Sequence, residues 1–307
     1  MEAREDVLFS CWIQEVGEDI GFLQEFFARA SGLGEAIMKV RKAAMEQGCQ
    51  DPVVFQCDPV ELDGDVEGLE PGPEAEVFWS VGRVFFDPGP GESEPDFVFP
   101  WGVVPSSGEG EVDTSEIGPG FERSSDEDGI EYLGANVSGP ELFPLYCRLL
   151  QLHPSYAVFW YVLHGHWAEK EEEDMEGPEE GPDRFLVNED LSTPEKIIAH
   201  LESRPLDSVR NGFVTLTAYL EEGETNLSIS DHKRIMVSSR SPSIVDAYQK
   251  TLEEAGLGLH PNLASIDAGV HHRHYRLPGS LPKEDLARSL LDSGFRVWDR
   301  GRGAAEP

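Results

Sequence analysis

The acidic residues of this chain are concentrated in its middle, and they limit how much of the chain can pack into a core. The 307 residues include 59 acidic and 24 basic side chains, for a formal net charge of −35, and residues 51–190 carry −29 of it. Three stretches within that segment, 58–76, 87–95 and 105–139, are rich in Gly, Pro, Ser, Asp and Glu. This composition favours mobile loops over packed structure. The acidic run 169–190 has the composition of a solvated linker.

The segments outside these acidic stretches predict an α+β protein with two domains. A chain of this length can form two domains that each bury a core. The predicted division is an N-terminal α+β domain over 1–168 that carries the acidic loops, the linker 169–190, a C-terminal domain over 191–300, and a tail over 301–307.

The C-terminal domain is predicted to have the ferredoxin-like βαββαβ topology. A short helix over 193–201 and a hairpin of strands 213–220 and 226–229 come before it. The six elements predicted for the ferredoxin-like unit are strand 234–238, helix 242–255, strands 263–267 and 270–277, helix 282–291 and strand 295–298.

The N-terminal half fits the same order of elements, with long acidic insertions between them. Apolar residues at helical spacing, among them Phe22, Phe26 and Phe27, predict a helix that breaks near Ser31. The six predicted elements are strand 7–13, helix 20–47, strands 52–57 and 76–86, helix 142–152 and strand 157–164. A further strand is predicted near 96–99.

The cysteines and the apolar stretches indicate a cytoplasmic protein. Cys11, Cys49, Cys57 and Cys147 form no CxxC pair, and in a reducing compartment such residues are usually separate buried thiols. The longest dense apolar stretch, 156–163, is far shorter than the roughly 20 residues of a membrane span. The acidic N-terminus does not resemble a secretory signal.

The charge distribution predicts a non-enzymatic protein that binds a basic protein partner through its middle region. An immunity protein for a nuclease-type toxin and a mimic of nucleic acid are concrete versions of this prediction. Like charge disfavours direct binding of nucleic acid or anionic membrane by that region. Adaptation to high salt is the alternative explanation of the acidity, but residues 191–307 are nearly balanced in charge. The acidic residues predicted to contact the partner are Asp58, Glu61, Asp63, Glu74, Glu76, Asp87 and Asp96.

A first alternative function is a metal-dependent hydrolase. His164 and His166 end a predicted strand, and residues i and i+2 of a strand lie on one face. Such a pair supplies two metal ligands, with a third ligand from elsewhere in the chain. No P-loop, G-x-G-x-x-G or G-x-S-x-G motif is present, and no cofactor is predicted.

A second alternative is RNA binding through the free face of the C-terminal sheet. Strand alternation places basic side chains of two strands on that face if Ile235 and Val237 face the helices. The residues predicted for this basic patch are Arg234, Arg240, His272, His274 and Arg276.

Overall fold

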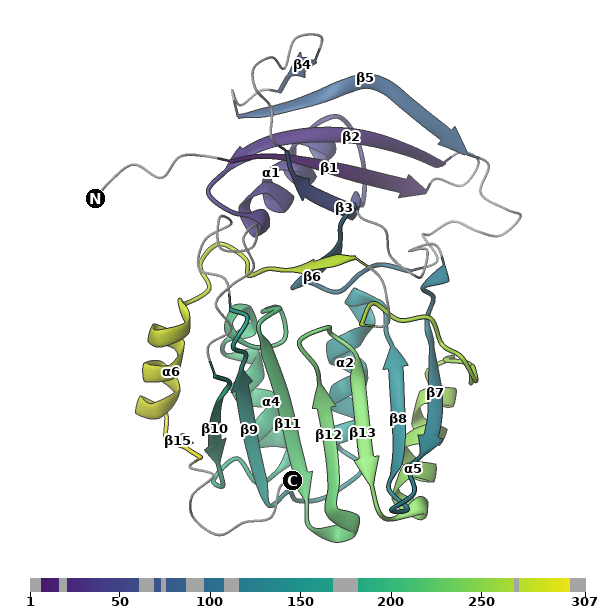
Figure 1. Ribbon diagram of the computed structural model, residues 1–307, viewed down its shortest axis with the longest axis vertical. Coiled ribbons are helices and arrows are strands. Elements are labelled where there is room, and N and C mark those ends of the chain that lie inside the picture. Colours follow the sequence, from purple (N-terminus) through teal and green to yellow (C-terminus); the bar gives the residue numbers. More distant parts are fainter. Residues whose placement is uncertain are drawn as a thin grey trace.

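The protein has a mixed α+β fold with two large antiparallel sheets, one above the other, and a small two-stranded sheet between them (Figure 1). The computed structural model describes residues 7–16, 21–60, 69–72, 76–86, 97–107, 116–167, 182–267 and 271–298. The predicted α+β class is confirmed. No described helix is long and apolar enough to cross a membrane.

The N-terminal sheet has five strands in the order β3-β1-β2-β5-β4, all antiparallel. Helix α1 (Leu33–Glu46) packs against it through an apolar stripe that includes Ile37 and Val40. The strands are β1 (Val7–Val16), β2 (Gly21–Ala30), β3 (Val53–Pro59), β4 (Glu70–Pro71) and β5 (Val77–Phe86).

The helix predicted over 20–47 is wrong in its first half, which forms β2. Burial on β2 alternates, with Phe26, Ala28 and Ala30 buried, and this is the period of two that a strand requires. β2 pairs with β1 on one side and with β5 on the other. The helix begins only after Ser31. The apolar residues of 21–30 fit either a helical or a strand period, and the backbone hydrogen bonds to β1 and β5 decide in favour of the strand.

Two of the four cysteines form a disulfide, so the prediction of four separate thiols is wrong. Cys11 of β1 lies directly opposite Cys57 of β3, with the two Cα atoms 4.1 Å apart, and the two residues are bonded. Cys49 and Cys147 are free thiols. The pairing was hidden in the sequence because 46 positions separate the two cysteines, and only the strand register brings them together.

The larger sheet has eight strands in the order β15-β10-β9-β11-β12-β13-β8-β7, and every pairing is antiparallel. Its strands are β7 (Gly120–Ser125), β8 (Glu131–Asn136), β9 (Val158–Leu163), β10 (Arg184–Asn188), β11 (Val214–Leu220), β12 (Thr225–Ile229), β13 (Ile235–Ser239) and β15 (Arg296–Val297).

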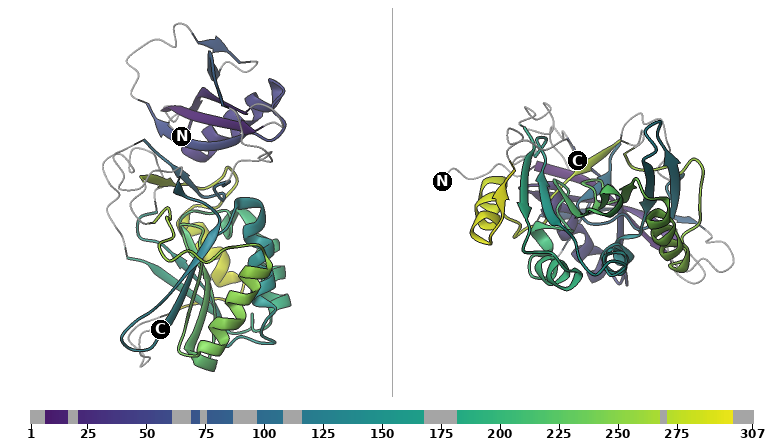
Figure 2. Two further views of the ribbon diagram at one scale, coloured as in Figure 1. Left: turned by 90° about the vertical axis from the view of Figure 1, so that its right-hand side faces the viewer. Right: turned by 90° about the horizontal axis from the view of Figure 1, so that it is seen from below.

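Four helices cover one face of the larger sheet and close the main core against it (Figure 2). Phe159, Tyr161 and Leu163 of β9 point into this core, whereas Trp160 and Val162 of the same strand belong to an apolar cluster on the other face. The helices are α2 (Gly139–Leu150), α4 (Pro194–Glu202), α5 (Pro242–Glu254) and α6 (Lys283–Asp292), and the short turns are η2 (Pro205–Asp207) and η3 (Glu222–Glu224).

The predicted ferredoxin-like topology is not confirmed, although the predicted hairpin of β11 and β12 is present. β13 pairs with β12 and β8, and β14 (His272–His274) pairs with β6 (Val103–Pro105) in the separate two-stranded sheet. No strand forms over 263–267. The hairpin of β7 and β8 takes the place beside β13 that the ferredoxin-like order required for another C-terminal strand. This hairpin lies within 105–139, which composition alone assigned to a loop.

The predicted two-domain division also differs from the strand pairing. β9 and β10 are neighbours in one sheet, and the predicted linker 169–190 contains β10. Residues 168–181 lie outside the described residues. The predicted boundary therefore falls inside the larger sheet, and α2 and β9, predicted to belong to the N-terminal domain, belong to this sheet and its core.

A partly buried histidine under the larger sheet is expected to make the fold sensitive to acid. His200 packs against Tyr161 and Phe295, with the Tyr161 hydroxyl 3.0 Å from its Nε2 atom. Burial, and then the Arg204 guanidinium, lower the pKa of His200 from 6.5 to about 4. In the unfolded chain the pKa of His200 returns to 6.5, so below that pH the unfolded state binds a proton that the folded state does not. The stability that neutral His200 contributes is therefore complete above pH 6.5 and is lost as the pH falls towards 4.

Between pH 6.5 and 4, wild-type unfolding takes up a proton at His200, and this uptake makes the unfolding free energy fall with pH. We expect His200→Gln to remove up to about one proton from this uptake and so to flatten the slope of unfolding free energy against pH. Glutamine keeps a hydrogen-bonding partner for Tyr161 but does not titrate. Urea unfolding at several pH values measures the slope, with His260→Gln as the control on the exposed surface. Equal slopes in the wild type and His200→Gln would contradict the assignment.

Candidate functional site

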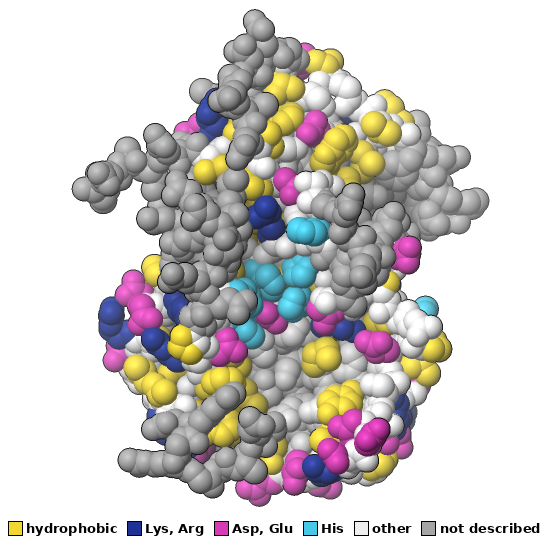
Figure 3. Space-filling view, viewed as in Figure 1, with side chains coloured by type: hydrophobic (Ala, Val, Ile, Leu, Met, Phe, Trp, Pro, Cys, Tyr) yellow, Lys and Arg dark blue, Asp and Glu magenta, His cyan; other side chains and the backbone are white. Residues whose placement is uncertain are grey.

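Five histidines and one aspartate lie together where the larger sheet meets the small two-stranded sheet. Histidine side chains gather near the middle of this face of the molecule (Figure 3). Two of the histidines follow the end of β9, one histidine and the aspartate lie in the turn between β12 and β13, and β14 supplies the remaining two histidines. The residues of this histidine cluster are His164, His166, Asp231, His232, His272 and His274.

The turn between β12 and β13 is held so that Asp231 points into the cluster. The backbone N–H of Asp231 donates to Thr215 Oγ1 at 3.0 Å, and the Lys233 ammonium donates to the carbonyl of Val214 at 3.1 Å. Lys233 is fully buried with φ 62°, a left-handed conformation that costs a non-glycine residue about 1 kcal/mol or more. Burial lowers the pKa of Lys233 to about 7.

β14 is brought to the cluster by a close backbone contact with the loop before β11. Tyr275 N donates to Gly102 O at 2.8 Å, and Gly212 N donates to Tyr275 O at 2.9 Å. His274 Nδ1 lies 2.6 Å from Gly212 O. A carbonyl oxygen only accepts, so Nδ1 carries the proton and Nε2 of a neutral His274 keeps its lone pair.

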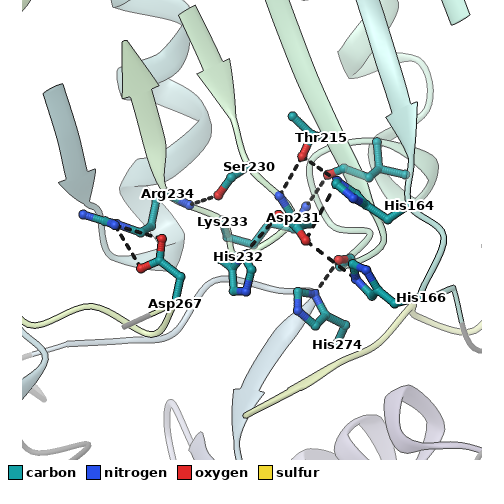
Figure 4. A network of polar contacts seen from close by, with 12 residues as sticks. His164, His166, Thr215, Ser230, Asp231, His232, Lys233, Arg234, Asp267 and His274 are labelled. Atoms are coloured by element: carbon teal, nitrogen blue, oxygen red, sulfur yellow. Dashed lines mark hydrogen bonds and ion pairs between the residues drawn. The ribbon is translucent and has the colours of Figure 1, made fainter. Parts of the chain in front are cut away.

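The first ligand set consists of His164, His166 and Asp231 (Figure 4). Asp231 Oδ2 lies 3.6 Å from His166 Nε2 and 3.9 Å from His164 Nε2. The buried His166 Nε2 atom has no hydrogen-bond partner among the described residues. His164 Nε2 contacts Thr215 Oγ1 at 2.8 Å, and its Nδ1 lies 3.7 Å from Asp183 Oδ1.

The second ligand set consists of His232, His272 and His274. The three ring centroids lie 4.8 to 5.2 Å apart. The set adjoins the first, because the rings of His166 and His274 are 4.8 Å apart, and His232 Nδ1 lies 3.1 Å from Asp231 Oδ1. One carboxylate therefore contacts both sets, with a different oxygen facing each.

Three of the histidines and Asp231 have the protonation states that bind metal ions. Burial lowers the pKa of His164, His166 and His274 below the ordinary value of 6.5. Burial alone would raise the pKa of Asp231, but the His232 hydrogen bond and the neighbouring histidines lower it overall. These histidines are therefore neutral and the aspartate is ionised at neutral pH, as metal coordination requires.

His164 and His166, predicted as a pair at the end of a strand, lie just after β9, and their ring centroids are 5.1 Å apart. Both residues follow the last residue of the strand, Leu163, so the turn after β9 places them rather than strand alternation. Asp231 and His232 were missed. Their signal was the Asp-His-Lys tripeptide in the turn of the hairpin that follows the predicted strand 226–229. Only the three-dimensional arrangement shows that this turn and the end of β9 meet.

The five residues of the predicted basic patch do not share one face. Arg234 is 5% exposed and binds Asp267 at 2.9 and 3.0 Å and Glu122 at 3.0 Å. Arg240, at the opposite end of β13, pairs with Glu224 at 2.9 Å. His272, His274 and Arg276 lie on β14 or just after it, outside the larger sheet. The patch is not assembled, because β14 pairs with β6.

Two of the seven predicted partner-binding acids are described, and both have contacts within the protein. Asp58 accepts hydrogen bonds from Ser107 N at 2.9 and 3.0 Å, and Glu76 pairs with Lys39 at 2.6 Å. The five that lie outside the described residues are Glu61, Asp63, Glu74, Asp87 and Asp96.

Comparison of the chain with protein-family models, with curated proteins and with solved structures finds no match.

Proposed function

We propose that this protein is a metal-dependent hydrolase whose metal ion is a zinc-class divalent cation held by His164, His166 and Asp231. The observation that carries the proposal is the convergence of three ligand atoms within 4.8 Å of one another. Two ligand atoms of a tetrahedral zinc ion, each about 2.0–2.1 Å from it, are about 3.4 Å apart. Small side-chain rotations are enough to close the set around an ion.

The ligand types and their neighbours support this assignment. Imidazole and carboxylate are common zinc ligands, and three protein ligands leave the fourth tetrahedral position for water, as in catalytic sites. Asp183 lies beside His164 Nδ1, where a carboxylate orients a metal-bound imidazole through its other nitrogen. A zinc-class ion held by His164, His166 and Asp231 would supply an activated water as the nucleophile for hydrolysis.

Metal analysis of untagged full-length protein tests the binding step. We expect the wild type to hold a stoichiometric zinc-class ion and His166→Ala to lose affinity by at least about tenfold, because a directly coordinating ligand is removed. His260→Ala is the matched control, since His260 is an exposed histidine outside the cluster. Failure of the wild type to take up metal would overturn the proposal.

The hydrolytic step has its own test. Ester and phosphoester reporter substrates should be hydrolysed by metal-loaded protein, and activity should disappear with a chelator and return with added metal. If the protein binds metal stoichiometrically but hydrolyses none of the reporter substrates, the proposed hydrolase activity is refuted and only the metal-binding site remains.

We propose a second candidate function, recognition of a basic protein such as a nuclease-type toxin, because residues 51–190 carry −29 of the −35 net charge. Affinity should fall steeply as salt screens the charges. Binding of a purified basic nuclease at low and high ionic strength measures this dependence, and affinity that does not change with salt would contradict it.

A further inference from the structure

We infer that the histidine cluster holds two cations, and that His232, His272 and His274 form the second position, linked to the first through Asp231. The inference rests on the proposed function for the first position only. The second ligand set is complete in itself, because three histidines alone hold zinc in known catalytic sites.

The second set is built from two segments far apart in the chain. His272 and His274 lie on β14 at positions i and i+2, so they lie on one face of the strand, and His232 approaches from the turn between β12 and β13. The three ring centroids are no more than 5.2 Å apart. Two separate elements therefore bring three imidazoles close enough together to offer three nitrogen ligand atoms to one ion.

Two of these imidazoles are already oriented as metal ligands. His274 donates its Nδ1 proton to Gly212 O at 2.6 Å, and His232 Nδ1 lies within hydrogen-bond distance of the Asp231 carboxylate, 3.1 Å from Oδ1. A metal-bound histidine almost always donates its other ring N–H to a carbonyl or a carboxylate in this way. Nε2 of each ring is left as the ligand atom.

Asp231 couples the two positions. Its Oδ2 atom faces His164 and His166, and its Oδ1 atom holds His232. A cation at the first position fixes the orientation of the carboxylate, and the carboxylate then fixes His232 for the second cation. Such coupling is reciprocal, so each cation changes the affinity for the other by the same factor.

Calorimetric titration of metal-free, untagged full-length protein with zinc tests the inference. We expect two equivalents to bind the wild type, one to bind His272→Ala and one to bind His166→Ala, while His260→Ala keeps two. Asp231→Asn should weaken both steps by about tenfold or more. Circular dichroism of each variant confirms that it is folded.

The outcomes separate the inference from the proposed function. One equivalent in the wild type, kept by His272→Ala and lost by His166→Ala, overturns the second position and leaves the first. One equivalent lost in both variants means a single mixed site and overturns the two-cation centre. Unchanged binding at the second position in Asp231→Asn overturns the coupling. No uptake by the wild type overturns both proposals.

Discussion

Gly212→Ala is expected to lower the free energy of unfolding by at least about 3 kcal/mol. A Cβ atom at this position would lie 1.9 Å from Gly102 O and 2.9 Å from Tyr275 N. Both are backbone atoms, so no rotamer change relieves the overlap and the two segments must separate. Overpacking of this kind costs about 1–3 kcal/mol, and more where nothing can adjust.

The same substitution should also weaken metal binding by the second ligand set. Gly212 O accepts the hydrogen bond from His274 Nδ1, and displacement of this carbonyl releases the imidazole. Urea unfolding and zinc titration measure the two effects. Gly118→Ala is the matched control, because a Cβ there meets nothing within 4 Å, and we expect its unfolding free energy to change by less than about 1 kcal/mol. Equal stability of the two variants would contradict the packing argument.

Arg234→Ala is expected to lower the unfolding free energy by about 3 kcal/mol. The Arg234 side chain is 6% exposed, and its guanidinium lies between Asp267 and Glu122. Removal of one partner from a fully buried ion pair costs about 3–5 kcal/mol, because the remaining charge loses its compensation. The low end of this range applies here, because the Asp267 and Glu122 side chains are 32% and 36% exposed and water screens the charges that remain. Burial alone would raise the pKa of Asp267, and the Arg234 charge is the largest cause that lowers it.

Arg240→Ala provides the comparison for Arg234. Arg240 is 47% exposed in its pair with Glu224, and an exposed pair contributes about 0–1 kcal/mol. Chemical denaturation of both variants, with the Arg234→Ala and Asp267→Ala double-mutant cycle, isolates the buried pair. A loss for Arg234→Ala no greater than that for Arg240→Ala would refute a structural role for Arg234.

Local patterns predicted many elements of this fold but not how they pair. The hairpin of β11 and β12 and the helices α2, α4, α5 and α6 were recognised from period, capping residues and glycine breaks. The order of strands was not, because pairing depends on contacts between distant segments. The ferredoxin-like prediction assumed that consecutive C-terminal strands share one sheet. β14 instead pairs with β6 in the separate two-stranded sheet.

The candidate site was predicted only where its residues are close in sequence. His164 and His166 are two positions apart and could be recognised as a pair. Asp231, His232, His272 and His274 join them from two other segments, and their meeting depends on the turn after β12 and on the backbone contact at Gly212. The acidic clusters on which the recognition hypothesis depends lie mostly outside the described residues.

The second ligand set takes His232 from the larger sheet and His272 and His274 from the small sheet. An ion coordinated by all three would act as a cross-link between two layers that otherwise meet through hydrogen bonds and side-chain packing. Its binding energy would then count towards folding as well as chemistry. Loss of the ion would weaken the contact between the two sheets, and the stability of the fold would then depend on the concentration of free metal.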